Sequence, residues 1–457
     1  MSDCRTGRAA RRPRGRLART VATATIAVAL ARVARADEPL DALATWHGAL
    51  SSVLVGASLA ADTNLNGALD ALALPATFTV DAGDVPAGAS LLAAYLWWGG
   101  TQAQPGGPLS SSPDTQVTLT PPGGAPFLVT AQASFGSDGG ASSYDVWICR
   151  ADVTAIVASP GGAAQAGTYA VDGYTGLLAD GSTDNASASL LLLFCHASLP
   201  ARQITLLDGL QTFFSSAASY TLALFPAAGT GNLSWHSLEG DPGSAAPEGV
   251  SADGSPGAAG PLPLSDAVNP AGDPMNRTIN TSATAQTGVI GVDIDRLDLS
   301  AALTAGDTSL ELVVSSGPDK WWLAVLVASL EIQPGPWVDL GQGLAGTHGV
   351  PVLAGIGSLA SGDPLDLVLG DALENSGSTL VVGLAALNAP FKGGVLVPLP
   401  SLLIFGLPTG PLGQIKLTAT WPSGVPSGIN LYLQHWITDA AGPKGLAASN
   451  AIVGTVP

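Results

Sequence analysis

The segment SASLLLLFCHAS (187–198) decides the fold class, because apolar residues run through its centre without a gap. A strand of this composition is buried on both faces, as strands in the core of a β-sandwich are. The segment SLLAAYLWWGG (90–100) has the same character and ends in two glycines. Both segments indicate a protein built from packed sheets.

Short apolar or β-branched segments recur along the chain, separated by Gly, Pro, Asn or Asp. Charged residues make up only 11% of the chain, while Gly (57) and Pro (34) are frequent. This balance favours short strands joined by turns over long helices, which need charged surface faces. We expect an all-β fold, in which ADVTAIVAS is the one segment that could instead form a short helix. Further strand candidates in the first part of the chain are ATFTVDA (76–82), TQVTLTPP (115–122), PFLVTAQASF (126–135), SYDVWICRADV (143–153), GTYAVDGY (167–174), RQITLLDGL (202–210), SYTLALFPAA (219–228), TSLELVVSS (308–316) and KWWLAVLVASLEIQ (320–333).

The motif PGPW (334–337) marks a linker between two domains. After it, strand candidates follow at a spacing of about 8–12 residues, which is typical of a small antiparallel sandwich. We therefore predict two antiparallel β-sandwich, jelly-roll-like domains, over residues 37–333 and 338–457. Within the first, segment 239–276 consists mostly of Gly, Pro, Ala and Ser. Because these residues supply neither period nor bulk, we expect an exposed loop over the sandwich.

Residues 1–36 have the pattern of a signal peptide. An arginine-rich leader precedes the apolar run VATATIAVALA (21–31), and Ala34-Arg35-Ala36 offers a cleavage site. The leader holds nine Arg and one Asp, so its removal leaves eight basic and 34 acidic residues, a net charge of −26. Because nucleic-acid binding requires Lys and Arg to neutralise phosphates, we expect no nucleic-acid partner. The apolar run is too short to span a bilayer, so we expect no transmembrane segment in the mature chain. The predicted location is extracellular or at the cell surface after export, with the periplasm as the fallback.

Two parts of the chain resemble bacterial surface proteins. AGASLLAAYLWWGGT, YDVWICRADVTAIV and LPARQITLLDGLQTF are similar to an uncharacterised extracellular β-domain of proteins labelled internalin-like or gliding-motility-associated. The C-terminal series GQGLAGTHGVPVLAGIGSLASGDPLDLVL, FKGGVLVPLP, PTGPLGQIKLTATWP and GINLYLQHWITDA resembles a tail module that recurs at the ends of many large secreted bacterial proteins. The resemblance implies an exported surface protein and assigns no catalytic residue.

The stretch DTNLNGALD (62–70) begins like a calcium loop of the EF-hand or dockerin type. Oxygen-bearing side chains stand at about positions 1, 3, 5 and 9 of such a loop, with a glycine at about position 6. Its twelfth position is an alanine instead of a bidentate carboxylate, so we expect at most weak Ca2+ binding. The alternative is an Asn-Gly turn without a metal. The candidate ligands are Asp62, Asn64, Asn66 and Asp70.

Cysteines and tryptophans suggest further sites. Cys149 and Cys195 both lie in apolar segments, where they form either a disulfide in an oxidising compartment or two buried thiols.

In an adjacent pair such as Trp97-Trp98, one ring points inward and the other outward from a strand. With Trp235, they are candidate surface aromatics that could stack on a sugar or a protein. The alternative places these rings in the core or under the long loop.

Two acidic stretches are candidates for chemistry. In WHSLEGD, Glu239 and Asp241 follow an aromatic residue, and a glycosidase needs two carboxylates that face each other across a sugar. In GVDIDRLDLS, Asp293 and Asp295 lie on one side of a strand and repel each other unless a cation screens them, which makes them candidate calcium ligands. In both cases the alternative, which we favour, is a polar turn or a strand with its acidic face in water.

These observations predict an exported structural or adhesive surface protein without catalytic activity. Its partner would be an extracellular glycan or another surface protein. A second hypothesis is a carbohydrate-binding module, stabilised by Ca2+. A third is a glycan-active hydrolase that uses Glu239 and Asp241, although the chain has no hydrolase, zinc-protease, phosphate-loop or dinucleotide motif.

Overall fold

A computed structural model describes most of the chain after the leader. The described residues are 38–103, 113–137, 144–158, 164–176, 178, 184–196, 198–241, 247–254, 260–281, 285–333, 335–410 and 413–457. The signal peptide predicted over residues 1–36 lies outside them. Nearly all regular structure in these ranges is β-strand, arranged in sheets that pack face to face, which confirms the all-β sandwich fold.

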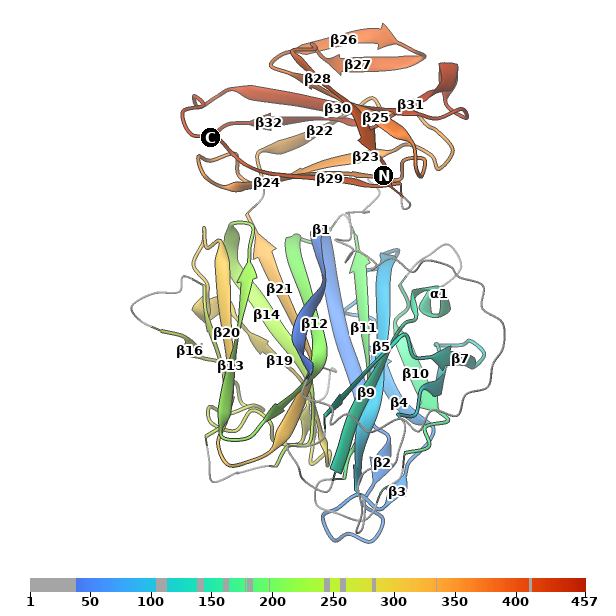
Figure 1. The fold of residues 1–457 in the computed structure, drawn as a ribbon, viewed down its shortest axis with the longest axis vertical. Coiled ribbons are helices and arrows are strands. Elements are labelled where there is room, and N and C mark those ends of the chain that lie inside the picture. Colours follow the sequence, from blue (N-terminus) through green and yellow to red (C-terminus); the bar gives the residue numbers. More distant parts are fainter. Residues whose placement is uncertain are drawn as a thin grey trace, which may run out of the picture.

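The N-terminal domain is built around an eleven-stranded sheet (Figure 1). Neighbouring strands pair antiparallel, except that β17 and β19 are parallel. In spatial order the strands are β18 (Gln286–Thr287), β17 (Thr278–Ile279), β19 (Val292–Asp298), β14 (Ala227–Leu238), β21 (Trp321–Ile332), β12 (Ala201–Phe213), β1 (Glu38–Ser58), β11 (Ala186–Cys195), β5 (Ser90–Ala103), β9 (Tyr144–Asp152) and β8 (Ala133–Ser137).

Two smaller sheets and a hairpin complete this domain. One four-stranded sheet contains β4 (Ala76–Val80), β10 (Gly167–Asp172), β6 (Gln116–Thr120) and β7 (Phe127–Thr130). The other contains β13 (Ser216–Ala223), β20 (Ser309–Ser316), β15 (Gly249–Asp253) and β16 (Leu262–Pro263). The remaining elements are the β2–β3 hairpin (Ala60–Ala61 and Ala71–Leu72), the helix α1 (Thr154–Val157) and the 3-10 turn η1 (Ser300–Ala302).

Strand β1 joins two halves of the large sheet. It is 21 residues long, and it pairs with β12 as far as Ala49 and with β11 from Leu50 onward. Strands that are distant in the sheet order, such as β11 and β19, are nevertheless in contact. The two halves therefore face each other across one apolar core, which contains Trp46, Trp97 and Trp322.

Each half is covered on its other face by a four-stranded sheet. The half with β5, β9 and β11 packs on the β4-β10-β6-β7 sheet around Trp98 and Tyr169. The half with β12, β14, β19 and β21 packs on the β13-β20-β15-β16 sheet around Trp235 and Trp321. The N-terminal domain thus consists of two sandwiches packed back to back, with apolar cores between successive sheets.

The C-terminal domain is a smaller sandwich. Its core, which includes Leu367 and Leu433, lies between a three-stranded sheet and a larger one. The larger sheet contains β22 (Trp337–Gly341), β32 (Ala451–Thr455), β30 (Asn430–Thr438), β25 (Gly377–Gly383) and β28 (Leu402–Pro408), with β31 (Leu446–Ala448) paired to β30. The other elements are β23 (Val352–Ile356), β24 (Pro364–Gly370) and β29 (Ile415–Thr420), the β26–β27 hairpin (Ala386–Phe391 and Gly394–Pro398) and the 3-10 turn η2 (Pro443–Gly445).

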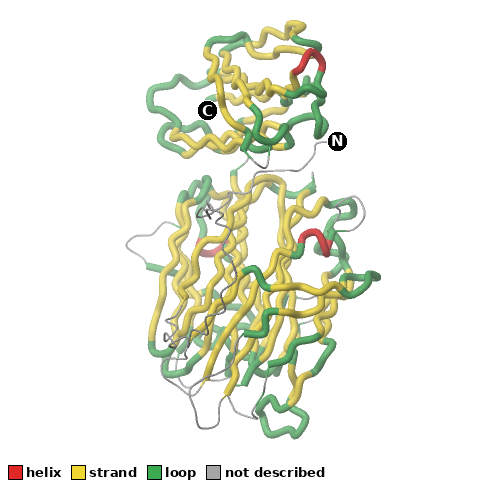
Figure 2. Tube along the Cα trace, turned by 45° about the vertical axis from the view of Figure 1, so that its right-hand side comes forward, coloured by secondary structure: helices red, strands yellow, loops and turns green. Residues whose placement is uncertain are grey.

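The C-terminal domain sits at one end of the long strands of the N-terminal domain (Figure 2). Phe225 and Ile332 from the first domain form an apolar cluster with Ile356 and Val368 from the second. The buried side chain of His47 packs against the Phe225 ring, with 4.7 Å between the ring centroids. The contact therefore combines apolar packing with a histidine that is removed from water.

The segment predicted as an exposed loop, 239–276, is partly a packed element. It supplies β15, the third strand of a four-stranded sheet, and Val250 and Ala252 of β15 lie in the core. Met275 is 1% exposed. The expectation of an exposed loop is wrong for these residues. Strand β15 pairs antiparallel with β20, so backbone hydrogen bonds to β20 hold this segment as a strand although its composition is that of a loop.

Candidate functional site

The tryptophans predicted as surface aromatics are all buried. Trp97, Trp98 and Trp235 are each 0% exposed. Trp97 and Trp98 do point to opposite faces of their strand, since they belong to different apolar cores. The interpretation as exposed rings is wrong because both faces of this sheet are covered by other sheets, and the alternative that places the rings in the core is confirmed. A sugar-stacking platform at these residues is therefore excluded by their burial.

Cys149 and Cys195 do not form the disulfide considered from the sequence. Cys149 lies on β9 and Cys195 on β11, and β5 runs between these strands. Two strand spacings are about 9.5 Å, which exceeds the Cα separation of about 7 Å that a disulfide tolerates. The side chains also face different cores. Both residues are buried thiols, as the alternative interpretation stated.

The stretch 62–70 forms an exposed loop between β2 and β3. The Asp62 carboxylate accepts hydrogen bonds from the backbone N–H groups of Asn66 (3.2 Å) and Gly67 (2.8 Å). The Asp70 carboxylate accepts bonds from the Thr63 backbone N–H and hydroxyl, and these bonds lower the pKa of Asp70. A cation would share both carboxylates with these donors. Calcium at Asp62, Asn64, Asn66 and Asp70 stays a prediction.

The two acidic stretches singled out in the sequence are brought together beneath segment 239–276. Asp293 and Asp295 project from β19, which pairs with β14, and Glu239 follows β14 directly. Asp293 and Asp295 are 0% exposed and Glu239 is 4% exposed. The expectation of an acidic face in water is therefore wrong, because segment 239–276 and its neighbours cover this face. Glu248, which the sequence did not single out, is also buried here.

In Asp293 and Glu248, one carboxylate oxygen is held by a backbone donor, and no N–H or hydroxyl donor among the described residues reaches the other. The Glu248 side chain also hydrogen-bonds with the carboxyl group of Asp319, which raises the pKa of Glu248. Asp293 Oδ1 accepts bonds from the N–H groups of Asn276 (2.8 Å) and Thr278 (2.9 Å), and its Oδ2 accepts none. Glu248 Oε2 accepts a bond from the Met275 N–H (3.3 Å), and its Oε1 accepts none. Asp319, in the turn between β20 and β21, lies close enough to Glu239 and Glu248 to raise the pKa of both. We call Glu239, Glu248, Asp293 and Asp319 the carboxylate cluster.

Burial and mutual repulsion govern the charge of the cluster. Burial, with the Asp319 carboxylate beside it, raises the pKa of Glu248 to about 9. Burial raises the pKa of Glu239 well above its usual range, and Asp319 adds to that effect. The pKa of Asp293 is raised by burial and by the neighbouring Asp295. The nearby cation, Arg277, is engaged outside the cluster by Asp241 and by the Gly240 carbonyl.

A polar cleft of about 530 Å³ lies at the C-terminal end of β19, and no residue of the carboxylate cluster lines it. Asn280 lines the cleft, and its backbone N–H donates to Oδ1 of Asp295, the buried neighbour of Asp293 on β19, at 2.8 Å. Neither Glu239 nor Asp241 lines this cleft, so the two carboxylates of the hydrolase hypothesis do not face it. The other polar lining residues are Asn232, Asp266, Arg296 and Asp298.

The C-terminal domain exposes an apolar strand at a sheet edge. β28 is the last strand of its sheet, and residues 402–405 of this strand, Leu-Leu-Ile-Phe, are all exposed, with Phe405 at 70%. No charged residue occurs between Lys392 and Lys416. Natural sheets usually protect such edges with charges or a covering element. We call residues 402–405 the apolar edge. This strand is not among those predicted above, although the apolar run in SLLIFGLP (401–408) is a sequence signal for it.

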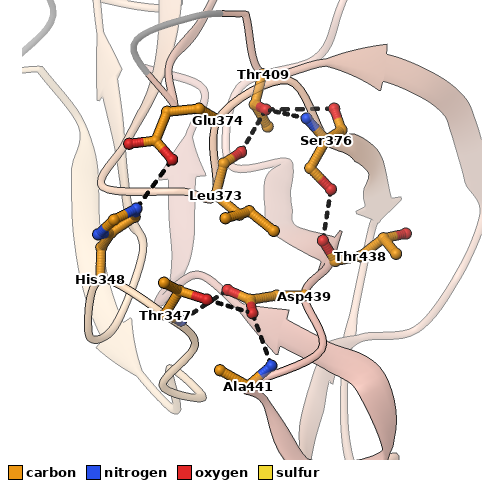
Figure 3. A network of polar contacts seen from close by, with 9 residues as sticks. All are labelled: Thr347, His348, Leu373, Glu374, Ser376, Thr409, Thr438, Asp439 and Ala441. Carbon is orange, nitrogen blue, oxygen red and sulfur yellow. Dashed lines mark hydrogen bonds and ion pairs between the residues drawn. The ribbon is translucent and has the colours of Figure 1, made fainter.

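A polar network fastens several turns of the C-terminal domain (Figure 3). The Thr347 backbone N–H and hydroxyl donate to the Asp439 carboxylate (2.7 and 2.8 Å). The exposed His348 and Glu374 are 3.0 Å apart, and this contact lowers the pKa of Glu374. The Ser376 hydroxyl donates to a backbone carbonyl. Since these hydroxyls are bound to carboxylate or backbone acceptors, the network holds loops in place.

Comparisons with known proteins add little. No family model and no curated protein matches the chain. One solved structure, published under the words "The Triple Jelly Roll Fold and Turret Assembly in an Archaeal Virus", aligns with 88% of this chain and 89% of its own, at 11% identity and a TM-score of 0.16. At that score the likeness carries no argument. In the described ranges, no helix has the length and apolar character to cross a membrane.

Proposed function

We propose that this protein is an exported structural or adhesive surface protein without catalytic activity, and that it makes its contacts through the apolar edge of the C-terminal domain. The exposure of residues 402–405 on an edge strand carries the proposal. Such a strand presents unpaired backbone groups together with apolar side chains, which is a template for pairing with another strand. Export and surface location rest on the leader pattern and on the resemblance to bacterial surface proteins.

The partner that fits this edge is a second copy of the chain. The whole chain has a net charge of −18, so two copies repel over most of their surfaces. The edge lies in an uncharged stretch, where two copies can approach without placing like charges opposite each other. Antiparallel pairing of β28 with its counterpart across a twofold axis would extend the sheet and cover Phe405 in both copies.

Sedimentation velocity of the mature chain tests this proposal. The wild type should form dimers whose fraction rises with protein concentration, and Phe405→Lys should stay monomeric because the charge lies in the interface. Leu128→Lys is the matched control, since Leu128 is also exposed (66%) on an edge strand, β7. It should dimerise like the wild type. A monomeric wild type, or a Phe405→Lys variant that dimerises equally well, would show that the edge is not the contact.

Glycan binding remains as a second candidate function, supported by the polar cleft and not by tryptophans. Carboxylate, amide and guanidinium groups at Asp266, Asn280 and Arg296 can hydrogen-bond sugar hydroxyls. A glycan array probed with the wild type and with Arg296→Ala tests it. Binding that the variant loses supports a glycan-binding module; no binding by the wild type removes this candidate.

A further inference from the structure

Two carboxyl groups of the cluster, Glu248 and Asp319, are in side-chain hydrogen-bond contact. The Met275 N–H binds Glu248 Oε2 at 3.3 Å. The Lys320 N–H binds Asp319 Oδ1 at 2.9 Å. The remaining oxygens, Glu248 Oε1 and Asp319 Oδ2, are buried, and no N–H or hydroxyl donor among the described residues reaches them. One proton between the two groups would satisfy both oxygens, because a protonated carboxyl donates a hydrogen bond and a carboxylate accepts it.

The acidic neighbours of Glu248 favour its protonated form. They come from four parts of the chain: Asp273 in segment 239–276, Asp319 in the β20–β21 turn, Glu239 after β14 and Asp293 on β19. Burial and the adjacent Asp319 raise the pKa of Glu248 to about 9, while the hydrogen bond from Met275 opposes this rise. Glu248 therefore keeps its proton at neutral pH.

The basic side chains of this region are engaged by other groups. Arg277 donates to the Gly240 carbonyl and pairs with Asp241. The Lys320 ammonium group lies 5.3 Å from the centre of the Phe214 ring. A buried carboxylate that no cation neutralises is costly. A proton between Glu248 and Asp319 removes one of the two negative charges.

Glu248 connects three segments of the chain. It directly precedes β15, whose pairing with β20 begins at Gly249. The Glu248 backbone N–H donates to the Gly272 carbonyl at 3.0 Å, and its side chain accepts the bond from Met275. Its contact with Asp319 reaches the β20–β21 turn. The pair therefore ties the start of β15 and residues 272–275 to that turn.

We propose that Glu248 and Asp319 share one proton, and that this proton fastens segment 239–276 to the β20–β21 turn, so that the segment loosens at alkaline pH. Loss of the proton leaves two carboxylates in contact inside the protein, where they repel each other. Because folding raises the pKa of Glu248 from 4.5 to about 9, its contribution to stability is complete below pH about 4.5 and is lost as the pH rises through about 9. The pair lies in the N-terminal domain and does not involve the apolar edge.

Urea unfolding of the wild type and of Glu248→Gln, from pH about 5 to pH about 9, tests the shared proton. The Gln amide can accept the Met275 N–H and donate to Asp319 without a titrating proton. The unfolding constant of the wild type, divided by that of Glu248→Gln, should rise by up to about tenfold for each pH unit. Glu311→Gln, at a partly exposed glutamate on β20, is the matched control and should keep the wild-type pH dependence. A ratio that stays constant with pH would overturn the proposal.

Asp319→Asn keeps the test decisive if Glu248→Gln does not fold. The Asn amide donates a hydrogen bond to the Glu248 carboxylate, so this variant should lose the same part of the pH dependence. An Asp319→Asn variant with the full pH dependence of the wild type would contradict the shared proton.

Limited proteolysis of the wild type with subtilisin tests the loosening of the segment directly. Cleavage within segment 239–276, mapped by mass spectrometry, should accelerate above pH about 9 relative to cleavage of the exposed 62–70 loop. The loop serves as the internal reference because the activity of the protease itself changes with pH. A constant ratio of the two cleavage rates across this pH range would show that the proton does not fasten the segment.

Discussion

Acidification should weaken the contact between the two domains through His47. This residue of β1 is 5% exposed. Burial, with the positive charge of Lys416 from the C-terminal domain, lowers the pKa of His47 from 6.5 to about 4, against opposing effects of Asp366 and a hydrogen bond with Gln203. His47 is therefore neutral in the folded protein with its domains in contact. Protonation at low pH favours a state in which the His47 side chain is exposed to water.

The magnitude follows from the two pKa values. A histidine whose pKa is lowered by folding contributes stability above its unfolded pKa of 6.5, and this contribution is lost as the pH falls toward about 4. Since one pKa unit is worth about 1.4 kcal/mol, the full loss is about 3 kcal/mol. His47→Gln keeps a neutral polar side chain and should not show this loss.

Urea unfolding of the wild type and of His47→Gln, from pH about 7 to pH about 4, measures the effect. Other titrating groups, such as the carboxylate cluster and the buried His236, are common to both proteins and cancel in the difference. As the pH falls, the free energy of unfolding of the wild type should drop by about 3 kcal/mol more than that of His47→Gln. His348→Gln, at an exposed histidine, should follow the wild type. Parallel pH curves for the wild type and His47→Gln would refute the reasoning.

Three further predictions concern the predicted sites and the double sandwich. Trp98→Ala should lower the free energy of unfolding by about 3–5 kcal/mol and leave glycan-array signals unchanged, because the ring fills a core; a loss of glycan binding at unchanged stability in urea would contradict its burial. Arg150→Met should cost about 3–5 kcal/mol in the same assay, because Arg150 on β9 pairs with the buried Asp208 on β12 at 2.5 Å. Adding Asp208→Leu to Arg150→Met should recover part of that loss, because it removes the unpaired carboxylate. An Arg150→Met variant as stable as the wild type would show that the pair does not hold the two halves of the sheet together. Asp62→Asn should abolish weak Ca2+ binding by the 62–70 loop, expected at Kd on the order of 10⁻⁴–10⁻³ M; equal calorimetric binding by wild type and variant would exclude the loop as a site.

The sequence predicted strands well where apolar runs were uninterrupted. SASLLLLFCHAS became β11, whose residues are all buried, and SLLAAYLWWGG became β5. The number of sheet layers was not predictable, because alternation tells which side chains share a face and not what covers that face. Trp97 and Trp98 illustrate this limit: their opposite directions were predicted, but the sequence left open whether the second ring is exposed or covered, and the structure buries both.

Strands that depend on tertiary pairing could not be predicted from local sequence patterns. β1 contains Ala, Leu, Gly and Ser with no regular alternation, yet it is central because β12 and β11 bind different parts of it. β28 carries its apolar residues consecutively between prolines, so no period marked it as a strand. In each case the backbone partners on neighbouring strands, and not local propensity, decide the conformation.

The buried acidic residues could be predicted only in part from the sequence, because their burial depends on segments that are distant in the chain. Placing Asp293 and Asp295 on one face followed from the strand period, and both are buried in the structure. That this face is covered could not be predicted, because segment 239–276 has the composition of a loop. Glu248 gave no signal either, since a single acidic residue among Pro, Ala and Gly is normally solvated.

Hydrogen exchange at the backbone N–H groups of β28 tests the central claim, contact between copies through the apolar edge, most directly. Exchange of residues 402–407 in the wild type should slow as protein concentration rises, because pairing with a second β28 protects these groups, and Phe405→Lys should show no such change. Exchange in β28 that is the same at low and high concentration, while the mature chain is folded, would contradict the account.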